Sequence, residues 1–421
     1  MDQPLRIYLC IDLKCFFASV ECVERQLDPF TTPLVVADPS RGRGAICLAV
    51  SPKMKSLGVK NRCRIYEIPT TLDYQVALPR MNLYIDYASR IYAIYLKYIA
   101  KEDIHVYSID ECFLDITAYL SLYRMGPTAL AKTILQDIFA TTGICATVGI
   151  GTNLYLAKVA LDLLSKQAVN HLGWLDEKAY QDQLWHHRPL TDFWQVGRGI
   201  ATRLARLGIE DMAGMAHADP RLLQQEFGIN GSYLYDHAWG REPCTIAEIQ
   251  AYQRQAQSVS SSQVLFEDYS YEKALLVLQE MVEQGCLDLT NRKLVTPRIG
   301  LYVGYAKDTI RGTGGARMLG ITTQAFSLIL PQVVALYEAT TKRDQPIRRL
   351  GISFLDVQAE THAQYDLFTN PEEAEAEHAV QETLNFIKQK YGKNAILKAM
   401  NLEEGATMRR RNRLVGGHNA E

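Results

Sequence analysis

An acidic pair inside an apolar run constrains this chain more than any other feature. In YSIDECFLDI, residues 107–116, Asp110 and Glu111 stand side by side between segments that favour buried strands. Ionised carboxylates are costly to remove from water unless a cation or hydrogen-bond donors compensate them. The pair is therefore predicted to form a hairpin tip, where both side chains face a metal ion or, as the simpler alternative, solvent beside a lysine or arginine.

A third acid lies near the end of the first predicted strand. RIYLCIDL is rich in β-forming residues and contains Asp12, and CFFASVECVERQ then shows the spacing of a helix. The elements predicted up to residue 165 follow the order β-α-α-β-β-α-β around an insertion, which fits a split βαβ, ferredoxin-like sheet. This topology would place Asp12 beside Asp110 and Glu111, so a cluster of three carboxylates is predicted.

The rest of the chain divides into further regions, so an α+β multidomain fold is predicted. Residues 30–80 are short, irregular segments punctuated by Pro and Gly, and residues 166–243 are short helices broken by glycines. Residues 255–360 show a second β-α-β-β-α-β order. NPEEAEAEHAVQETLNFIKQKYG predicts a capped amphipathic helix, and the basic segment after it is predicted to be a mobile tail.

Composition excludes several classes of protein. The 45 Lys and Arg residues against 47 Asp and Glu give a net charge of −2, so there is no overall signal for nucleic acid, although IRRL and RRRNR are local basic clusters. The nine cysteines form no C-x-x-C pair, which argues against a disulfide framework or a zinc knuckle. Neither a membrane span nor a secretory signal is recognisable, so a cytoplasmic protein is predicted.

The predicted acids suit hard cations. Oxygen-only ligands with no nearby His or Cys cluster favour Mg²⁺, with Mn²⁺ as a substitute, over zinc. Two such ions about 3.5 to 4 Å apart can activate a hydroxyl and stabilise a leaving pyrophosphate. The residues alone therefore indicate metal-dependent phosphoryl transfer.

Four motifs in order resemble the Y-family translesion DNA polymerases, and among them the UmuC-like branch (DNA polymerase V catalytic subunit type). They are IDLKCFFASVE, YSIDECFLDI, TVGIGTNLYLAKVALD and WQVGRGIATRLARLGI, and the resemblance spans essentially the whole chain. It implies an error-prone, lesion-bypass DNA polymerase of the DNA damage response. The family's domains would fall as follows: palm at 1–29 and 81–165, fingers at 30–80, helix-hairpin-helix thumb at 166–243, little finger at 244–363, and clamp-binding motif and helical tail at 364–421.

The resemblance also implies roles for individual residues. Asp12, Asp110 and Glu111, with the backbone carbonyl of Leu13, would hold two Mg²⁺ ions while the primer 3′-hydroxyl attacks a dNTP. Phe17 falls at the steric-gate position, where an aromatic ring excludes a ribose 2′-hydroxyl, whereas Phe16 reads as core. Lys158 matches the lysine that reaches the triphosphate, and Lys166 is a second candidate.

Two places depart from the family pattern. The first motif commonly reads D-x-D, but Lys14 takes the second place, so only one acid comes from that strand. In SPKMKSLGVK, Pro52 and Lys55 replace the tyrosine and arginine with which many relatives grip the triphosphate. Pro52 offers no hydroxyl, and Lys55 keeps the positive charge but loses the bidentate fork of arginine.

Partners are implied by two further segments. The thumb hairpin QVGRG would bring backbone N–H groups of Gly197 and Gly199 to phosphates of the primer–template DNA without reading bases. QYDLF matches the pentapeptide that engages the bacterial sliding clamp, with Leu367 and Phe368 as apolar anchors and Gln364 as a hydrogen-bonding residue. Some UmuC-like enzymes also require recombinase or accessory subunits, and the sequence leaves that question open.

Two alternatives to a polymerase remain at this point. A non-catalytic accessory protein would keep the DNA-binding and clamp-binding surfaces, but such relatives lose acids that are all present in this chain. A nucleotide cyclase could use the same sheet and acids, but it would leave the thumb hairpin and QYDLF unexplained.

Overall fold

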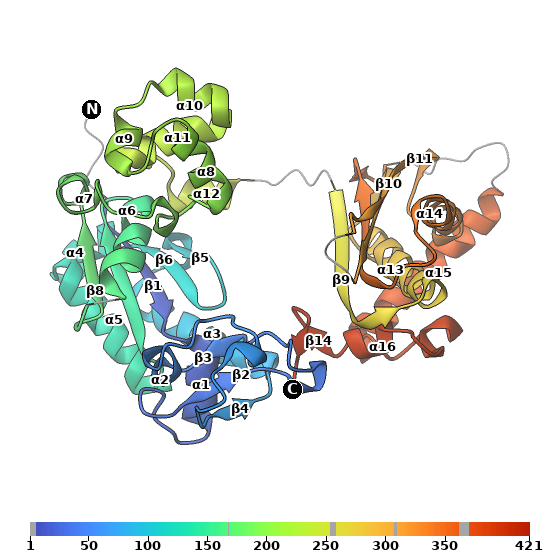
Figure 1. The fold of residues 1–421 in the computed structure, drawn as a ribbon, viewed down its shortest axis with the longest axis horizontal. Coiled ribbons are helices and arrows are strands. Elements are labelled where there is room, and N and C mark those ends of the chain that lie inside the picture. The colour runs from blue at the N-terminus through green and yellow to red at the C-terminus, as the bar shows by residue number, and fades with distance from the viewer. Residues whose placement is uncertain (1–5, 167, 253–257, 307–309, 362–369) are drawn as a thin grey trace. The chain divides into compact units, whose positions relative to one another are not determined.

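The computed structural model describes residues 6–166, 168–252, 258–306, 310–361 and 370–421, and the chain forms two compact units (Figure 1). Unit 1 comprises Met1–Gln253 with Ala420–Glu421, and unit 2 comprises Arg254–Asn419. Each unit has its own sheet with helices packed on it, as the α+β prediction requires. Within the described ranges, no helix is both long enough and apolar enough to cross a membrane.

A five-stranded sheet forms the centre of unit 1. Its strand order is β5 (Ile104–Val106), β6 (Glu111–Asp115), β1 (Tyr8–Leu13), β7 (Ala146–Gly151) and β8 (Leu172–Leu175). All neighbours are antiparallel except β7 and β8, which are parallel. The edge strand β8 is an addition to the ferredoxin-like order that the sequence predicts. β1 is the central strand, and its first four residues are buried.

Helices pack on this sheet and beside it. Their bounds are α1 (Phe16–Glu24), α3 (Met81–Tyr98), α4 (Thr117–Tyr123), α5 (Pro127–Thr142), α6 (Leu154–Val159) and α7 (Glu177–Leu184). A π-helical turn, Ala160–Ser165, continues α6. α6 lies so close to β7 that a Cβ atom on Gly149 would meet the carbonyl oxygen of Ala157 at 2.1 Å. The glycines of TVGIG are therefore required by this packing.

The segment inserted between α1 and α3 forms a small sheet of its own. β2 (Leu34–Val36) lies between β3 (Ala49–Val50) and β4 (Gln75–Ala77). Ser51 caps α2 (Pro52–Ser56) by accepting a hydrogen bond from the backbone of Met54, and Pro52 occupies the first helical position, which proline favours. This capping explains Pro52 structurally.

Short helices follow the sheet of unit 1. They are α8 (Arg198–Arg206), α9 (Met212–Ala216), α10 (Pro220–Phe227), α11 (Ile229–Ala238) and α12 (Ile246–Ala251). Buried residues of these helices, among them Leu204, Met212 and Leu223, share one core with Tyr155 of α6 and with Phe193, which precedes α8. The helices are thus fixed to the sheet through α6.

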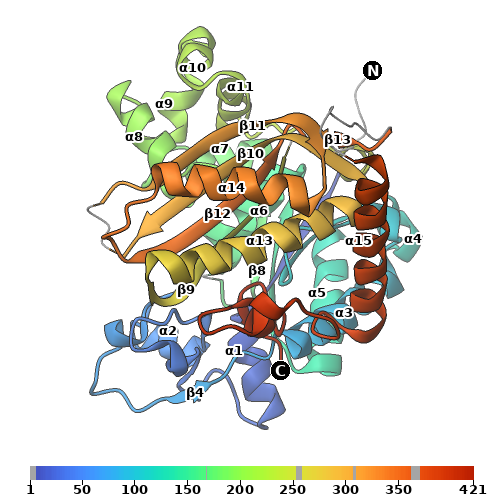
Figure 2. The same cartoon turned by 90° about the vertical axis from the view of Figure 1, so that its right-hand side faces the viewer.

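Unit 2 contains a five-stranded antiparallel sheet with helices on one face (Figure 2). Its strand order is β11 (Thr313–Thr323), β10 (Leu294–Tyr305), β12 (Ile347–Leu355) and β9 (Ser258–Tyr269), and β13 (Gln358–Ala359) pairs with β10. α13 (Tyr271–Asn291) and α14 (Phe326–Thr340) bury Ile299, Leu350 and Phe354 of the sheet. The other face, which we call the open face, carries small and polar residues together with the exposed side chains of Val264, Tyr302 and Met318.

The predicted mobile tail is instead folded, so that prediction is wrong. After the expected helix α15 (Pro371–Tyr391), capped by Asn370, come α16 (Met408–Arg411), β14 (Leu414–Val415) and β15 (His418–Asn419). The buried carboxylate of Glu280 on α13 accepts hydrogen bonds from the backbone N–H of Thr407 at 2.7 Å and of Met408 at 3.1 Å, and from the Asn401 side chain at 3.0 Å. Glu280 therefore fixes the start of α16 to unit 2.

Candidate active site

The backbone brings the three predicted acids to one end of the unit 1 sheet. Asp12 on β1 stands directly opposite Glu111 on β6, and the N–H of Leu13 donates to the carbonyl oxygen of Asp110 at 2.9 Å. Asp110 immediately precedes β6, and Glu111 is its first residue. The β5–β6 hairpin therefore places Asp110 and Glu111 beside Asp12, nearly a hundred residues away in sequence.

Each acidic side chain of this cluster has a partner from the chain. Asp12 pairs with the Lys166 ammonium at 3.2 Å, Asp110 accepts from the Ser108 hydroxyl at 2.7 Å, and Glu111 pairs with Lys158 at 2.8 Å. In the part of the chain that the structure describes, no three His, Cys, Asp or Glu side chains converge in the geometry of a metal site. The backbones of the acids are adjacent, while their carboxylates are held by other groups.

The electrostatics of the cluster show what kind of ligand it would accept. Burial raises the pKa of Asp12 to about 6; the Lys166 ammonium opposes this rise, and the carboxylates of Asp110 and Glu111 add to it. Crowded acidic oxygens of this kind are stabilised by positive charge. A divalent cation therefore fits the donor set, which consists of oxygens.

Lys158 and Lys166 occupy different environments. Lys158 is buried and bridges Glu111 and Asp162, so its ammonium is already engaged. The Lys166 side chain is 42% exposed and reaches both Asp12 and Asp162. The sequence favoured Lys158 as the triphosphate ligand, but in this structure Lys166 is the lysine with an accessible ammonium beside the acids.

Lys158 and Lys166 share Asp162 as a partner. Both stand four residues from Asp162, the spacing at which side chains meet on one face of a helix, and their ammonium groups lie 3.0 and 2.7 Å from its carboxylate. The segment between the two lysines, Ala160–Ser165, is a π-helical turn. Such bulges are frequent at functional sites.

Phe17 lies next to the acids on α1 and rests on a second aromatic ring. Its ring stacks on Tyr84 of α3 with centroids 4.6 Å apart and planes 18° apart. Tyr84 is buried, and its hydroxyl donates to Glu21 at 2.7 Å. Arg80 donates to both carboxylate oxygens of Glu21, at 3.0 and 2.8 Å. The Phe17 ring is thus half-buried and packed against Tyr84, whereas Phe16 belongs to the core and is 2% exposed.

Lys14 and Lys55, two residues that depart from the family pattern, both place their charge near Cys15. The Lys14 ammonium lies over the Phe30 ring, 5.8 Å from its centroid, instead of adding a carboxylate to the cluster. Lys55 on α2 is exposed. Burial raises the pKa of the Cys15 thiol, and the nearby Lys55 ammonium opposes that rise. Lys55 therefore places its positive charge beside the loop that follows Asp12.

A contact that the sequence did not reveal joins the helical region to the acidic hairpin. The indole N–H of Trp194 donates to the Tyr107 hydroxyl at 3.2 Å, and the two rings meet edge to face. Tyr107 begins the turn that carries Asp110. Three residues beyond Trp194, Gly197 precedes α8, and a Cβ atom on either Gly197 or Gly199 would meet no neighbouring atom within 4 Å. The space beside these glycines is open to a ligand.

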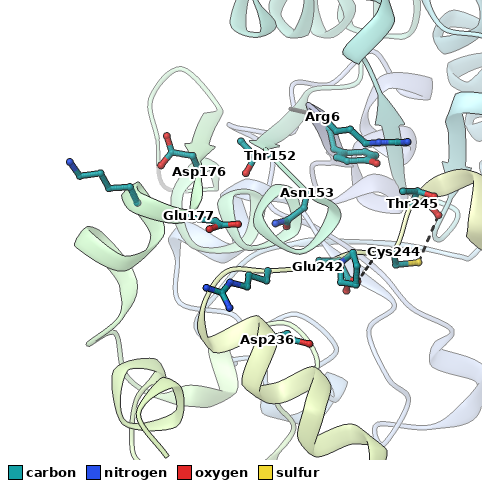
Figure 3. Close-up of a pocket in the computed structure, with 13 residues that line it drawn as sticks. Arg6, Thr152, Asn153, Asp176, Glu177, Asp236, Glu242, Cys244 and Thr245 are labelled. Carbon is teal, nitrogen blue, oxygen red and sulfur yellow. Dashed lines mark hydrogen bonds between the residues drawn. The ribbon is translucent and has the colours of Figure 1, made fainter. Parts of the chain in front are cut away.

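A pocket of about 750 Å³ opens at the other end of β1 (Figure 3). It is lined by Arg6, Tyr8 and Asn153, among others, and Tyr8 is four residues, or about 13 Å, along the strand from Asp12. The Asn153 amide already donates to the carbonyl oxygen of Gly240 at 2.8 Å. This pocket is separate from the acidic cluster. The predicted clamp residues Gln364, Leu367 and Phe368 lie outside the described residues.

Comparison with family models and known proteins covers nearly the whole chain. The model described as the impB/mucB/samB family matches residues 11–162, and that of the impB/mucB/samB family C-terminal domain matches residues 256–367. The putative UV-damage repair protein UvrX of Bacillus subtilis (strain 168) is 32% identical across 99% of this chain and 98% of its own length. DNA polymerase IV 2 of the same organism is 28% identical across 98% of each chain.

A solved structure has the same fold. The Y-family DNA polymerase chimera Dbh-Dpo4(243-245)-Dbh matches with a TM-score of 0.64, covering 84% of this chain and 99% of that chain, at 21% sequence identity.

Proposed function

The chain belongs to the impB/mucB/samB family of Y-family DNA polymerases. We therefore propose that it is a template-directed, lesion-bypass DNA polymerase that extends a primer at the cluster of Asp12, Asp110 and Glu111. The observation that carries the proposal is the pairing of Asp12 with Glu111 across β1 and β6, next to the hydrogen bond from Leu13 to Asp110. Placement in the UmuC-like branch stays a prediction, since the relatives above are named UvrX and DNA polymerase IV.

The acids would hold the divalent ions of the reaction. Asp12, Asp110, Glu111 and the Leu13 carbonyl are the proposed ligands, and Mg²⁺, with Mn²⁺ as a substitute, suits their oxygens. When bound, such ions lower the pKa of a hydroxyl and neutralise charge on a leaving pyrophosphate. The chain's own contribution is to keep these acids ionised and aligned. Lys158 and Lys166 do so by offsetting their mutual repulsion.

The lysines also provide positive charge for the incoming dNTP. We propose Lys166 as the main triphosphate ligand, because its ammonium is partly exposed beside Asp12, whereas that of Lys158 is buried between two carboxylates. Lys158 then positions Glu111. Lys55 supplies a further charge from the small sheet region, in a point-charge role that differs from a bidentate arginine.

Phe17 is the proposed steric gate. Its half-buried ring lies on the first helix after Asp12, where it can meet the sugar of a nucleotide bound at the acids. A rigid ring under the sugar excludes a 2′-hydroxyl by overlap, so its position must be held. The stack on Tyr84 supplies that support.

Primer–template DNA is the proposed macromolecular substrate. Exposed Gly197 and Gly199 leave room for a phosphate to approach the backbone at the start of α8. The open face of unit 2 offers a second surface for the duplex. On this proposal the two-part sheet region is the palm, residues 30–80 the fingers, 166–243 the thumb and 244–363 the little finger, except that β8 belongs to the palm sheet and α12 to unit 1. QYDLF is proposed to engage the sliding clamp.

Single-nucleotide primer extension tests the assignment. Asp110→Asn and Glu111→Gln keep the size of each side chain but remove its charge, and each should reduce incorporation by at least about 100-fold, because metal-assisted charge stabilisation is worth several kcal/mol. Asp115→Asn, at the other end of β6 where Asp115 pairs with Arg6, is the matched control and should keep wild-type activity. Retained incorporation by purified Asp110→Asn or Glu111→Gln would refute the site.

A further inference from the structure

The end of the chain presents three arginines beside the sheet of unit 2. Arg409, Arg410 and Arg413 are exposed and lie in or next to α16, and we call them the basic tail patch. Among the residues that the structure describes, no carboxylate forms an ion pair with any of them, whereas the nearby acids Asp268 and Glu404 are paired with Arg348 and Lys273. In the described part of the chain, these three arginines are therefore not neutralised by direct ion pairs.

The basic tail patch is held in a fixed place. Glu280 is 1% exposed and binds the backbone at the start of α16 through Thr407 and Met408. A buried carboxylate is costly unless it is fully hydrogen-bonded, so undocking α16 would leave Glu280 unsatisfied. The arginines are thus presented by a folded segment.

Arg410 reaches the edge of the sheet at β9. β9 is an edge strand, and its register with β12 places Ser262 opposite Gly351 and Ser260 opposite Ser353 on the open face. Phe266 lies further along β9, beyond Val264, where the pairing with β12 becomes irregular. The Arg410 guanidinium lies 3.8 Å from the centre of the Phe266 ring. The basic tail patch therefore lies at the β9 edge of the sheet.

The chemistry of the combined surface fits a nucleic-acid backbone. Gly351, Ser260, Ser262 and Ser353 are small, which allows a polymer to approach the strands closely, and four strands about 4.8 Å apart make a face about 14 Å wide. That width is close to the major groove of B-DNA, about 12 Å.

We propose that the basic tail patch binds phosphates of the primer–template duplex and extends the DNA-binding surface of unit 2 past β9. This rests on the proposed function, because the duplex is taken to lie on the open face. The arginines neutralise phosphates, so they contribute affinity and position and read no bases. They also explain how a chain with a net charge of −2 can hold DNA.

Binding of a fluorescein-labelled primer–template duplex across a series of KCl concentrations tests this proposal. The triple variant Arg409→Gln, Arg410→Gln, Arg413→Gln should bind more weakly, and the slope of log affinity against log salt should fall by about 0.9 for each phosphate that the variant no longer neutralises. The matched control is Arg292→Gln, Lys293→Gln, Lys390→Gln, which removes the same charge near the far end of α13 and on α15. It should keep the wild-type slope.

The proposal would be overturned if the glutamine triple variant and the control triple variant bound the duplex with the same affinity and the same salt slope, whether both matched the wild type or both decreased equally. The lysine triple, Arg409→Lys, Arg410→Lys, Arg413→Lys, should keep the slope because it keeps the charge. If the glutamine triple fails to fold, Phe266→Leu replaces it, and an unchanged slope there counts against the role of Arg410. A wild-type chain that binds the duplex with the expected slope but adds no nucleotide would refute the polymerase assignment and leave the patch standing.

Discussion

If Phe17 is the steric gate, as we propose, its stack on Tyr84 should make sugar selection depend on a residue that need not touch the nucleotide. Tyr84→Leu removes the ring beneath Phe17 while leaving Phe17 in place. Aromatic pairs of this geometry contribute about 0.5–1.5 kcal/mol beyond the area they bury. If that energy holds the gate against the sugar, its removal should lower the preference for dNTP over rNTP by about 2- to 13-fold, at tenfold per 1.36 kcal/mol.

The assay is single-nucleotide insertion, with kcat/KM measured for dCTP and CTP opposite the same template base. Tyr84→Phe keeps the ring and should keep the preference. Tyr87→Leu is the matched control: Tyr87 is also buried on α3 and bonds an acid of α1, Glu24, at 2.7 Å, but it forms no stack with Phe17. An unchanged preference in Tyr84→Leu, with selection abolished in Phe17→Ala, would refute the supporting role of Tyr84. Unchanged selection in both would show that Phe17 is only packing.

Three other predictions follow from residues around the sheet of unit 1. Lys166→Ala should raise KM for dNTPs about 10-fold, the value of one charge-assisted hydrogen bond, whereas Lys166→Arg should not; a rise only in Lys158→Ala would restore the sequence-based assignment. Gly149→Ala should lower Tm and the free energy of unfolding by about 1–3 kcal/mol through overpacking against Ala157, and an unchanged Tm would contradict the close packing of α6. Burial alone would raise the pKa of Glu21, but hydrogen bonds from Arg80, Tyr84 and Arg25 outweigh burial and lower the pKa. The stabilisation that Glu21 provides is therefore complete above its ordinary pKa of about 4.3 and is lost as the pH falls below that value. In urea unfolding, the free energy of unfolding of Glu21→Gln should therefore depend less on pH in the acid range than that of the wild type.

Topology made the acidic cluster predictable from the sequence. A hairpin carrying Asp110 and Glu111 has few places to pair in a split βαβ sheet, and the strand that contains Asp12 is one of them. Local patterns also predicted the capped helix at Pro371–Tyr391 and the alternating strands of unit 2. The helix and the strands depend on short-range periodicity, which can be read directly from the sequence.

Long-range packing was not predictable in the same way. Glu280 reads as one more charge in a helix rich in Glu, and nothing local says that it binds the backbone of Thr407. The ion pair of Lys166 with Asp12 joins segments far apart in the sequence, and no local residue pattern marks it. Tyr84 lies on α3, the second helix of the predicted β-α-α-β-β-α-β order, but which ring it would meet depended on how two helices pack.

The pairing of the acids with lysines and a serine has a consequence for the resting enzyme. Since Asp12, Asp110 and Glu111 each already have a partner within the chain, the fold does not need a dissolved ion to balance its own charge. A chelator should therefore switch synthesis off and leave the melting temperature almost untouched, and returning the ion should restore the enzyme without any refolding step.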